Sequence, residues 1–233
     1  MDIKKILTKQ QNHSKWAHDI FYLTVFIIAG ILGRYILVGW NIQPFPNFEI
    51  IMILTFLAAL IMKPYLAFLV PLFSMIGSDF FLGNPLFAGN QMNKIIIFTY
   101  SGFILIALLS VLTRKQTIPH LRGIRLKHIA LSTGIGVGLA LVYDLWTNIG
   151  WWYLMYPHNP ESLIAVLAAG IPFMIYHMLS ASFTFTLIGL PLLNIKNWKK
   201  QLRFPKPLSQ NQKITYITIA FLCIVFSVTL LVF

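Results

Sequence analysis

The feature that most constrains this chain is the alternation of long apolar runs with short segments rich in lysine and arginine. A helix needs roughly 20 mostly apolar residues to cross the hydrocarbon core of a membrane. Seven apolar runs approach or exceed that length: Ile20–Trp40, Phe48–Met62, Tyr65–Phe81, Ile95–Leu112, Ile129–Trp146, Leu163–Leu193 and Ile214–Phe233. The pattern predicts an all-α, polytopic transmembrane helical bundle with a six-helix core and one additional C-terminal helix.

Composition supports this class. Hydrophobic residues make up 58% of the 233 residues and charged residues only 10%, whereas an ordinary soluble domain has about 25% charged residues. The high apolar content also excludes a disordered chain. Cys223 is the single cysteine, which excludes a disulfide scaffold.

The second and third runs are separated only by Lys63 and Pro64. Proline disfavours helical backbone at the residue before it, so we expect two helices with a tight break here. One long kinked helix is the alternative, but it would overrun a hydrocarbon core of about 30 Å.

The basic residues alternate between the two sides of this topology. Four precede the first run, Lys63 follows the second, five follow the fourth and six follow the sixth, so 16 of the 18 lie on one side. Lys94 is alone on the other side, and Arg34 lies inside a run. By the positive-inside rule the N-terminus is cytoplasmic and the C-terminus outside.

This distribution assigns the positive charge to orientation in a cell membrane and to contact with anionic lipids, and it argues against nucleic-acid binding. It also predicts the organisation of the chain. Residues 1–19 form a cytoplasmic basic segment, and 20–193 form the six-helix core with a substrate cavity at its outer face. Residues 194–213 form a cytoplasmic basic loop, and 214–233 form the additional helix.

Ionisable residues inside a membrane are costly and are therefore candidate site residues. Arg34, Glu49, Asp79 and Asp144 all fall in the outer half of the predicted bundle. Arg34 could pair with Asp144 or Asp79 across a cavity open to the outside. The alternatives are a structural ion pair that fixes helix register, or an Arg34 side chain that reaches up to the headgroups.

The predicted outer connections are rich in amides and aromatic rings instead of charges. Such groups suit the stacking and hydrogen bonding of a flat small molecule. The densest stretch is Thr147–His158, which we expect to be a loop. Candidate binding residues in these connections are Asn47, Asn84, Asn148, Trp151, Trp152 and Tyr156. Enrichment of Trp and Tyr at membrane interfaces is the alternative, and it accounts for Trp40 and Trp146.

The sixth run carries a polar stripe of Tyr176, His177, Ser180 and Thr184 that should face the bundle interior. His177 has no second ligand at metal-binding spacing, so a hydrogen-bonded core histidine is favoured over a metal ligand. We expect no resident metal or cofactor. Pro172 should kink this helix near its outer end, and the part beyond the kink could cover the cavity.

Small residues indicate close helix packing. Gly134 and Gly138 form a G-x-x-x-G pattern with Gly136 between them, and Ala29 and Gly33 share the same spacing. Packing inside the bundle is the commoner use of such pairs, and contact with a partner helix is the alternative.

No catalytic or nucleotide-binding motif is present, so we expect no enzyme and no internal ATPase. Four segments, Asn47–Glu49, Pro71–Gly83, Thr147–Pro157 and Gly170–Phe173, resemble an uncharacterised family of predicted membrane transport proteins. That family is similar to the S components of energy-coupling-factor transporters. The resemblance implies a six-helix core whose outer loops cap a vitamin or metal, with a membrane T component and cytoplasmic ATPases as partners. The extra last helix departs from it, and Ala29 with Gly33 only approximates the small-residue docking pattern of such proteins.

The sequence thus predicts a substrate-binding subunit of a small-molecule uptake transporter, with a flat organic ligand such as a vitamin favoured over a bare ion. The predicted site consists of Arg34, Asn47, Asp79, Asn84, Asp144, Asn148, Trp151, Trp152, Tyr156 and His177. A structural or assembly subunit of a larger membrane complex is the first alternative. A membrane enzyme that uses Asp79, Asp144 or His177 as acid or base on a lipid headgroup is the second.

Overall fold

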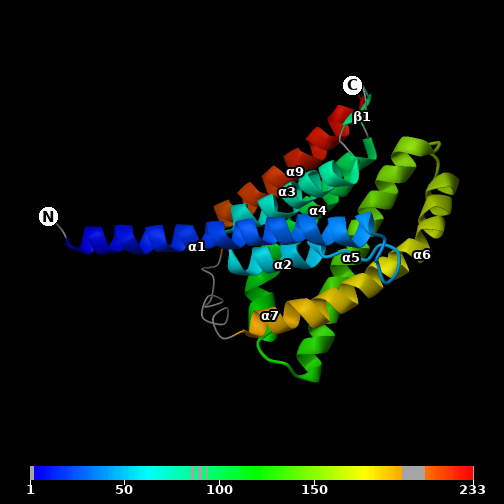
Figure 1. Ribbon diagram of the computed structural model, residues 1–233. Coiled ribbons are helices and arrows are strands. Elements are labelled where there is room, and N and C mark those ends of the chain that lie inside the picture. Colours follow the sequence, from blue (N-terminus) through cyan, green and yellow to red (C-terminus); the bar gives the residue numbers. More distant parts are fainter. Residues whose placement is uncertain (1–2, 85–86, 89–90, 93, 196–207, 233) are drawn as a thin grey trace.

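The computed structural model describes residues 3–84, 87–88, 91–92, 94–195 and 208–232, and it is an all-α bundle (Figure 1). Its helices are α1 (Ile3–Arg34), α2 (Ile51–Ile61), α3 (Pro64–Leu82), α4 (Lys94–His120), α5 (Leu126–Met155), α6 (Pro160–Thr184), α7 (Leu190–Asn194) and α9 (Gln210–Val232). Two π-helical turns, η1 (Tyr35–Gly39) and η2 (Phe185–Gly189), continue α1 and α6. Strands β1 (Phe87–Ala88) and β2 (Gln91–Met92) form a short antiparallel ladder.

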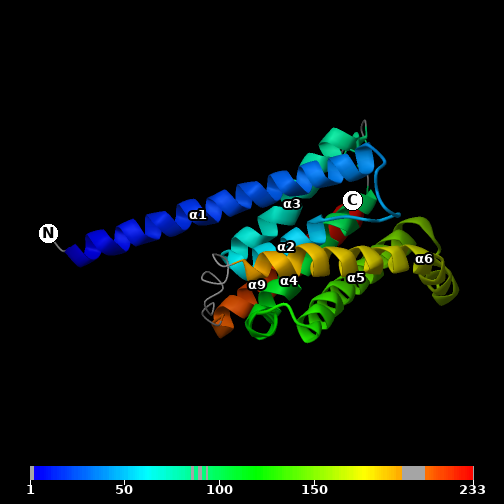
Figure 2. The same ribbon diagram turned by 60° about the horizontal axis from the view of Figure 1, so that its bottom comes forward.

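Five helical segments in the described part of the chain are long and apolar enough to cross a membrane, which indicates a membrane-embedded protein. They are residues 16–39, 64–82, 94–120, 126–155 and 160–194. The N-terminal part of α1 projects beyond the other helices (Figures 1 and 2). Helix α9 follows the predicted seventh run closely and packs against α4.

Helix α2 is short and lies in the centre of the bundle. Every residue from Ile51 to Leu60 is buried, so no part of this segment has to match the thickness of a membrane. The predicted break at Lys63-Pro64 is confirmed, and the single long helix is wrong. Met62 and Lys63 both have extended backbone, with ψ of 175° and 138°, as the following proline requires.

Helix α5 runs nine residues beyond the predicted end of its apolar run and ends at Met155. The predicted loop Thr147–His158 is therefore largely the last turns of this helix, and that prediction is wrong. The helix ends where it does because Pro157 disfavours helical backbone at Tyr156, which is extended. The Asn159 side chain then caps α6 by accepting a hydrogen bond from Ser162 N at 2.8 Å.

Helix α6 contains Pro172 in its interior and changes direction along its length (Figure 1), as expected where a proline removes a backbone hydrogen bond. The π-helical turn η2 precedes Pro191, whose missing N–H prevents a regular continuation of the helix.

The basic connections meet at one end of the bundle. Lys63 Nζ lies 3.6 Å from Asp19 Oδ2, and Arg114 donates to the Met62 carbonyl at 3.4 Å. Gly123 N donates to Asn194 Oδ1 at 2.7 Å. Five basic residues of the segment after α7, Lys196, Lys199, Lys200, Arg203 and Lys206, lie outside the described residues. Which end faces the cytoplasm stays a prediction of the charge pattern.

Candidate functional site

A cavity of about 450 Å³ lies at the end of the bundle opposite these basic connections. Side chains from α1, η1, α3, α4, α5 and α6 and from the segment between η1 and α2 line it. Five of the predicted site residues are brought together here: Arg34, Asn47, Asp144, Asn148 and His177. The remaining lining residues are Val38, Gln43, Glu49, Met75, Thr99, Phe103, Tyr143, Thr147, Phe173 and Met174.

Arg34 forms an ion pair with Asp79, so of its two predicted partners the structure selects Asp79. The guanidinium Nη1 lies 2.5 Å from Asp79 Oδ1 and also donates to Ser78 Oγ at 2.8 Å. The other carboxylate oxygen accepts a hydrogen bond from Tyr100 Oη at 2.7 Å. Asp79 is buried on α3, and its two side-chain partners come from α1 and α4. The cluster therefore fixes the register of three helices at the wall of the cavity.

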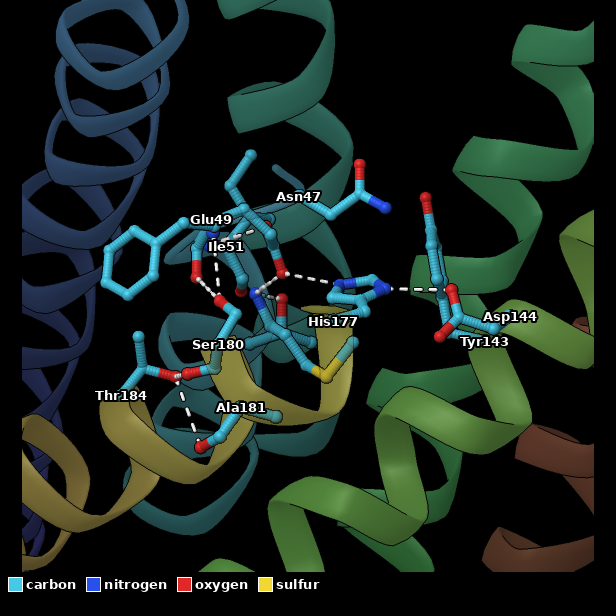
Figure 3. Close-up of polar contacts among 12 residues, drawn as sticks. Asn47, Glu49, Ile51, Tyr143, Asp144, His177, Ser180, Ala181 and Thr184 are labelled. Carbon is cyan, nitrogen blue, oxygen red and sulfur yellow. Dashed lines mark hydrogen bonds and ion pairs between the residues drawn. The ribbon is translucent and has the colours of Figure 1, made fainter. Parts of the chain in front are cut away.

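His177 lies between two carboxylates (Figure 3). Its Nδ1 is 2.8 Å from Asp144 Oδ1, and its Nε2 is 3.6 Å from Glu49 Oε1. These three residues come from α6, from α5 and from the residue pair that precedes α2. A protonated imidazole would bridge both carboxylates, and a neutral imidazole would still hydrogen-bond to Asp144.

The Glu49 carboxylate also caps the start of α2. It accepts hydrogen bonds from Ile51 N at 2.9 Å and from Met52 N at 3.2 Å, the first free backbone N–H groups of α2. The hydroxyl of Ser180 also contacts the Glu49 backbone N–H at 3.0 Å. The start of α2 is thus tied to α6, which holds Glu49 beside His177.

Within the described residues, Asp144 Oδ2 and His177 Nε2 are buried without a hydrogen-bond partner, and Nε2 has only its 3.6 Å contact with Glu49 Oε1. Asp144 is only 7% exposed and His177 only 5%. Buried polar atoms normally form hydrogen bonds, because an atom that does not has lost its hydration and gains no protein contact in exchange. Two unpaired atoms in adjoining residues of the cavity wall indicate a place where a ligand could supply the missing contacts.

A second cavity of about 350 Å³ adjoins the first and shares Asn148 and Phe173 with it. The predicted residues Trp151 and Tyr156 line this second cavity. A Cβ atom at Gly170 would lie 2.7 Å from Asn148 Nδ2. The glycine therefore lets α6 approach the Asn148 amide closely.

Three of the predicted residues do not line either cavity. Asp79 acts on the first cavity only through Arg34. Trp152 donates its indole N–H to Ser162 Oγ at 2.8 Å and so joins the end of α5 to the start of α6. Asn84 follows α3 and is exposed, and its backbone N–H donates to the Asp79 carbonyl at 2.9 Å.

The predicted site omitted Glu49, Thr99 and Tyr143, which line the cavity. Glu49 could have been included on its sequence signal, since it is one of only six acidic residues and lies at the start of the second apolar run. Thr99 and Tyr143 have no such signal, because neither residue is unusual in an apolar helix.

Within the described residues, no group of three His, Cys, Asp or Glu side chains is placed to hold a metal ion. Comparison with curated proteins and with solved structures finds no significant match. A family profile does match residues 14–201, a range that contains α2 to α7 and every residue that lines the two cavities. The chain therefore belongs to the family of unknown function DUF6580.

Proposed function

We propose that this protein is the substrate-binding subunit of a small-molecule uptake transporter, similar to the S components of energy-coupling-factor transporters. The observation that carries the proposal is the cavity of about 450 Å³ lined by Arg34, Glu49, Asp144, Asn148 and His177. Its volume lies within the range of small-molecule sites, about 300–1,000 Å³. Charged and amide groups on its wall would orient a ligand, and apolar helices surround it.

The charge pattern places this cavity at the outer face in the proposed arrangement. A ligand would then enter from outside, and the basic end would face the cytoplasm. The sequence contains no P-loop, so the energy for uptake would come from cytoplasmic ATPases through a membrane subunit that resembles a T component.

Native mass spectrometry of the full chain, purified in mild detergent from its host, tests the proposal. We expect a bound small molecule that is released on activation. Asn148→Ala combined with Trp151→Ala should lower both its occupancy and cellular uptake of the same compound, because these residues line the adjoining cavities. Trp40→Ala is the matched control, since Trp40 is an exposed aromatic outside both cavity walls. No bound molecule after metabolite screening, together with unchanged uptake in the double variant, would contradict the proposal.

One observation favours a second candidate, a structural or assembly subunit of a larger membrane complex. A Cβ atom added at Gly134 or at Gly138 would meet nothing within 4 Å, so this face of α5 is open to a partner helix. Pull-down in mild detergent discriminates between the two candidates. A stable partner that is neither an ATPase nor a T-like subunit favours the assembly role.

A further inference from the structure

The ionisable groups around the first cavity do not balance in charge. Arg34 contributes one positive charge, and the carboxylates of Glu49, Asp79 and Asp144 contribute three negative charges. His177 adds one positive charge if it is protonated and none if it is neutral. With the three carboxylates ionised, the five groups therefore sum to −1 if His177 is protonated and to −2 if it is neutral.

A net negative charge is costly at this depth. Arg34, Asp79, Asp144 and His177 lie on helices that are apolar enough to cross a membrane, and Glu49 lies against them. Isolated charges in such surroundings lose much of their hydration. Arg34, the cation of the set whose charge does not depend on its surroundings, is already engaged with Asp79 and Ser78. The uncompensated charge thus lies on the Asp144 and Glu49 side of the cavity.

The unpaired atoms lie on the same side. Asp144 Oδ2 has no hydrogen-bond partner among the residues that the structure describes, although Asp144 is only 7% exposed. The residue lines the cavity, so this oxygen can accept a hydrogen bond from a group inside it. A donor that also carries positive charge would satisfy the oxygen and offset the negative charge in one contact.

The aromatic groups beside Asp144 favour an organic cation over a bare metal ion. The rings of Phe103 and Tyr143 lie 4.7 Å apart, Tyr143 packs edge-on against His177 at 5.2 Å, and all three residues line the cavity. Aromatic faces attract alkylammonium and similar cations. No described His, Cys, Asp or Glu group is arranged for a metal, and the volume of about 450 Å³ suits a molecule.

We infer that the cavity recognises a small organic cation, whose protonated nitrogen donates to Asp144 on the side of the cavity bounded by Glu49 and whose uncharged body packs against Phe103 and Tyr143. This inference rests on the proposed function and names the substrate class for the same site. It narrows the earlier expectation of a flat organic ligand by assigning its charge.

Three probes of equal size and different charge test the inference: benzylamine, benzyl alcohol and benzoate. Binding to the full chain is measured by saturation-transfer NMR in nanodiscs of phosphatidylcholine, whose zwitterionic surface does not concentrate cations. We expect benzylamine to bind about tenfold or more tightly than benzyl alcohol, the effect of one charged hydrogen bond, and benzoate to bind more weakly than either.

Two variants test whether the preference for benzylamine arises from the carboxylates of the cavity wall. Asp144→Asn and Glu49→Gln should each reduce the preference for benzylamine over benzyl alcohol by about tenfold, because each removes one negative charge from the wall. Glu161→Gln is the matched control, since Glu161 is an exposed carboxylate in the first turn of α6 outside the cavity. It should leave the preference unchanged. Thermal unfolding shows which variants are folded. If Asp144→Asn is not folded, the preference for benzylamine is compared between Glu49→Gln and the unmodified chain.

Benzyl alcohol or benzoate binding as tightly as benzylamine would overturn the inference, and so would a preference that persists in the folded variants. A neutral or anionic molecule found by native mass spectrometry would overturn it while leaving the proposed function intact. Absence of any bound molecule, with no binding of the three probes, would overturn both.

Discussion

At the scale of single residues, the buried ion pair between Arg34 and Asp79 is the contact most important to stability. Asp79 is 4% exposed and receives hydrogen bonds from Arg34 and Tyr100. An ionised carboxylate at this depth is tolerated only with such partners. Removing the cation would leave an uncompensated charge, which costs more than removing both members of the pair.

Arg34→Ala should therefore destabilise the protein by about 3–5 kcal/mol, the cost of breaking one partner of a buried ion pair. The double variant Arg34→Met with Asp79→Leu should recover most of that loss, because no charge remains buried. Denaturant titration in a fixed detergent, followed by tryptophan fluorescence, measures both. Equal stability of the single and double variants would show that the pair contributes register only, without a buried-charge penalty.

At the scale of secondary-structure elements, the glycines of α5 show how one helix can use two faces differently. We expected Gly134 and Gly138 to pack inside the bundle, but a Cβ at either position would meet open space. Gly136, which lies between them, is packed. A Cβ there would lie 2.7 Å from Phe185 Cγ and 3.0 Å from the Ala181 carbonyl oxygen. The close approach of α5 to the α6–η2 segment thus depends on Gly136.

Gly136→Ala should destabilise the protein by about 1–3 kcal/mol, since a methyl group would be forced against a buried ring and a backbone oxygen. Gly134→Ala is its control on the same helix. It should be neutral or stabilising by up to about 1 kcal/mol, because alanine is the better helix former and nothing obstructs it. Thermal unfolding of the two variants in the same lipid measures which of them is less stable. A Gly134→Ala variant less stable than Gly136→Ala would contradict this packing.

At the scale of the whole molecule, the two ends of the bundle differ in chemistry. One end joins the basic connections through Lys63, Arg114 and Asn194. The other end holds the two cavities and the carboxylates of Glu49, Asp79 and Asp144. The positive-inside rule predicts that the basic end faces the cytoplasm, so the cavities would open to the outside.

Cysteine labelling in intact cells tests this orientation. In a Cys223→Ser background, Glu161→Cys should react with a membrane-impermeant maleimide added outside. Gln116→Cys should react only after the cells are lysed. Both positions are exposed, Glu161 at the cavity end and Gln116 in the basic end of α4, so a difference in labelling reports the side of the membrane. The reverse pattern would place the cavities in the cytoplasm.

The sequence by itself determined the helical class, the break at Lys63-Pro64 and the separation of charge. These features depend on local hydropathy, on proline sterics and on the order of residues along the chain. It also singled out Arg34, Asp144 and His177, because ionisable residues in apolar runs stand out without any knowledge of the fold.

Only the tertiary structure decided which of these groups meet. The choice of Asp79 over Asp144 for Arg34, and the position of Glu49 beside His177, depend on the rotation of each helix about its axis and on its register against its neighbours. Helix rotation also decides that Gly136 faces Phe185 and Ala181 in the interior of the bundle. Hydropathy is nearly uniform around helices this apolar, so the sequence carries little information about rotation, and packing determines it.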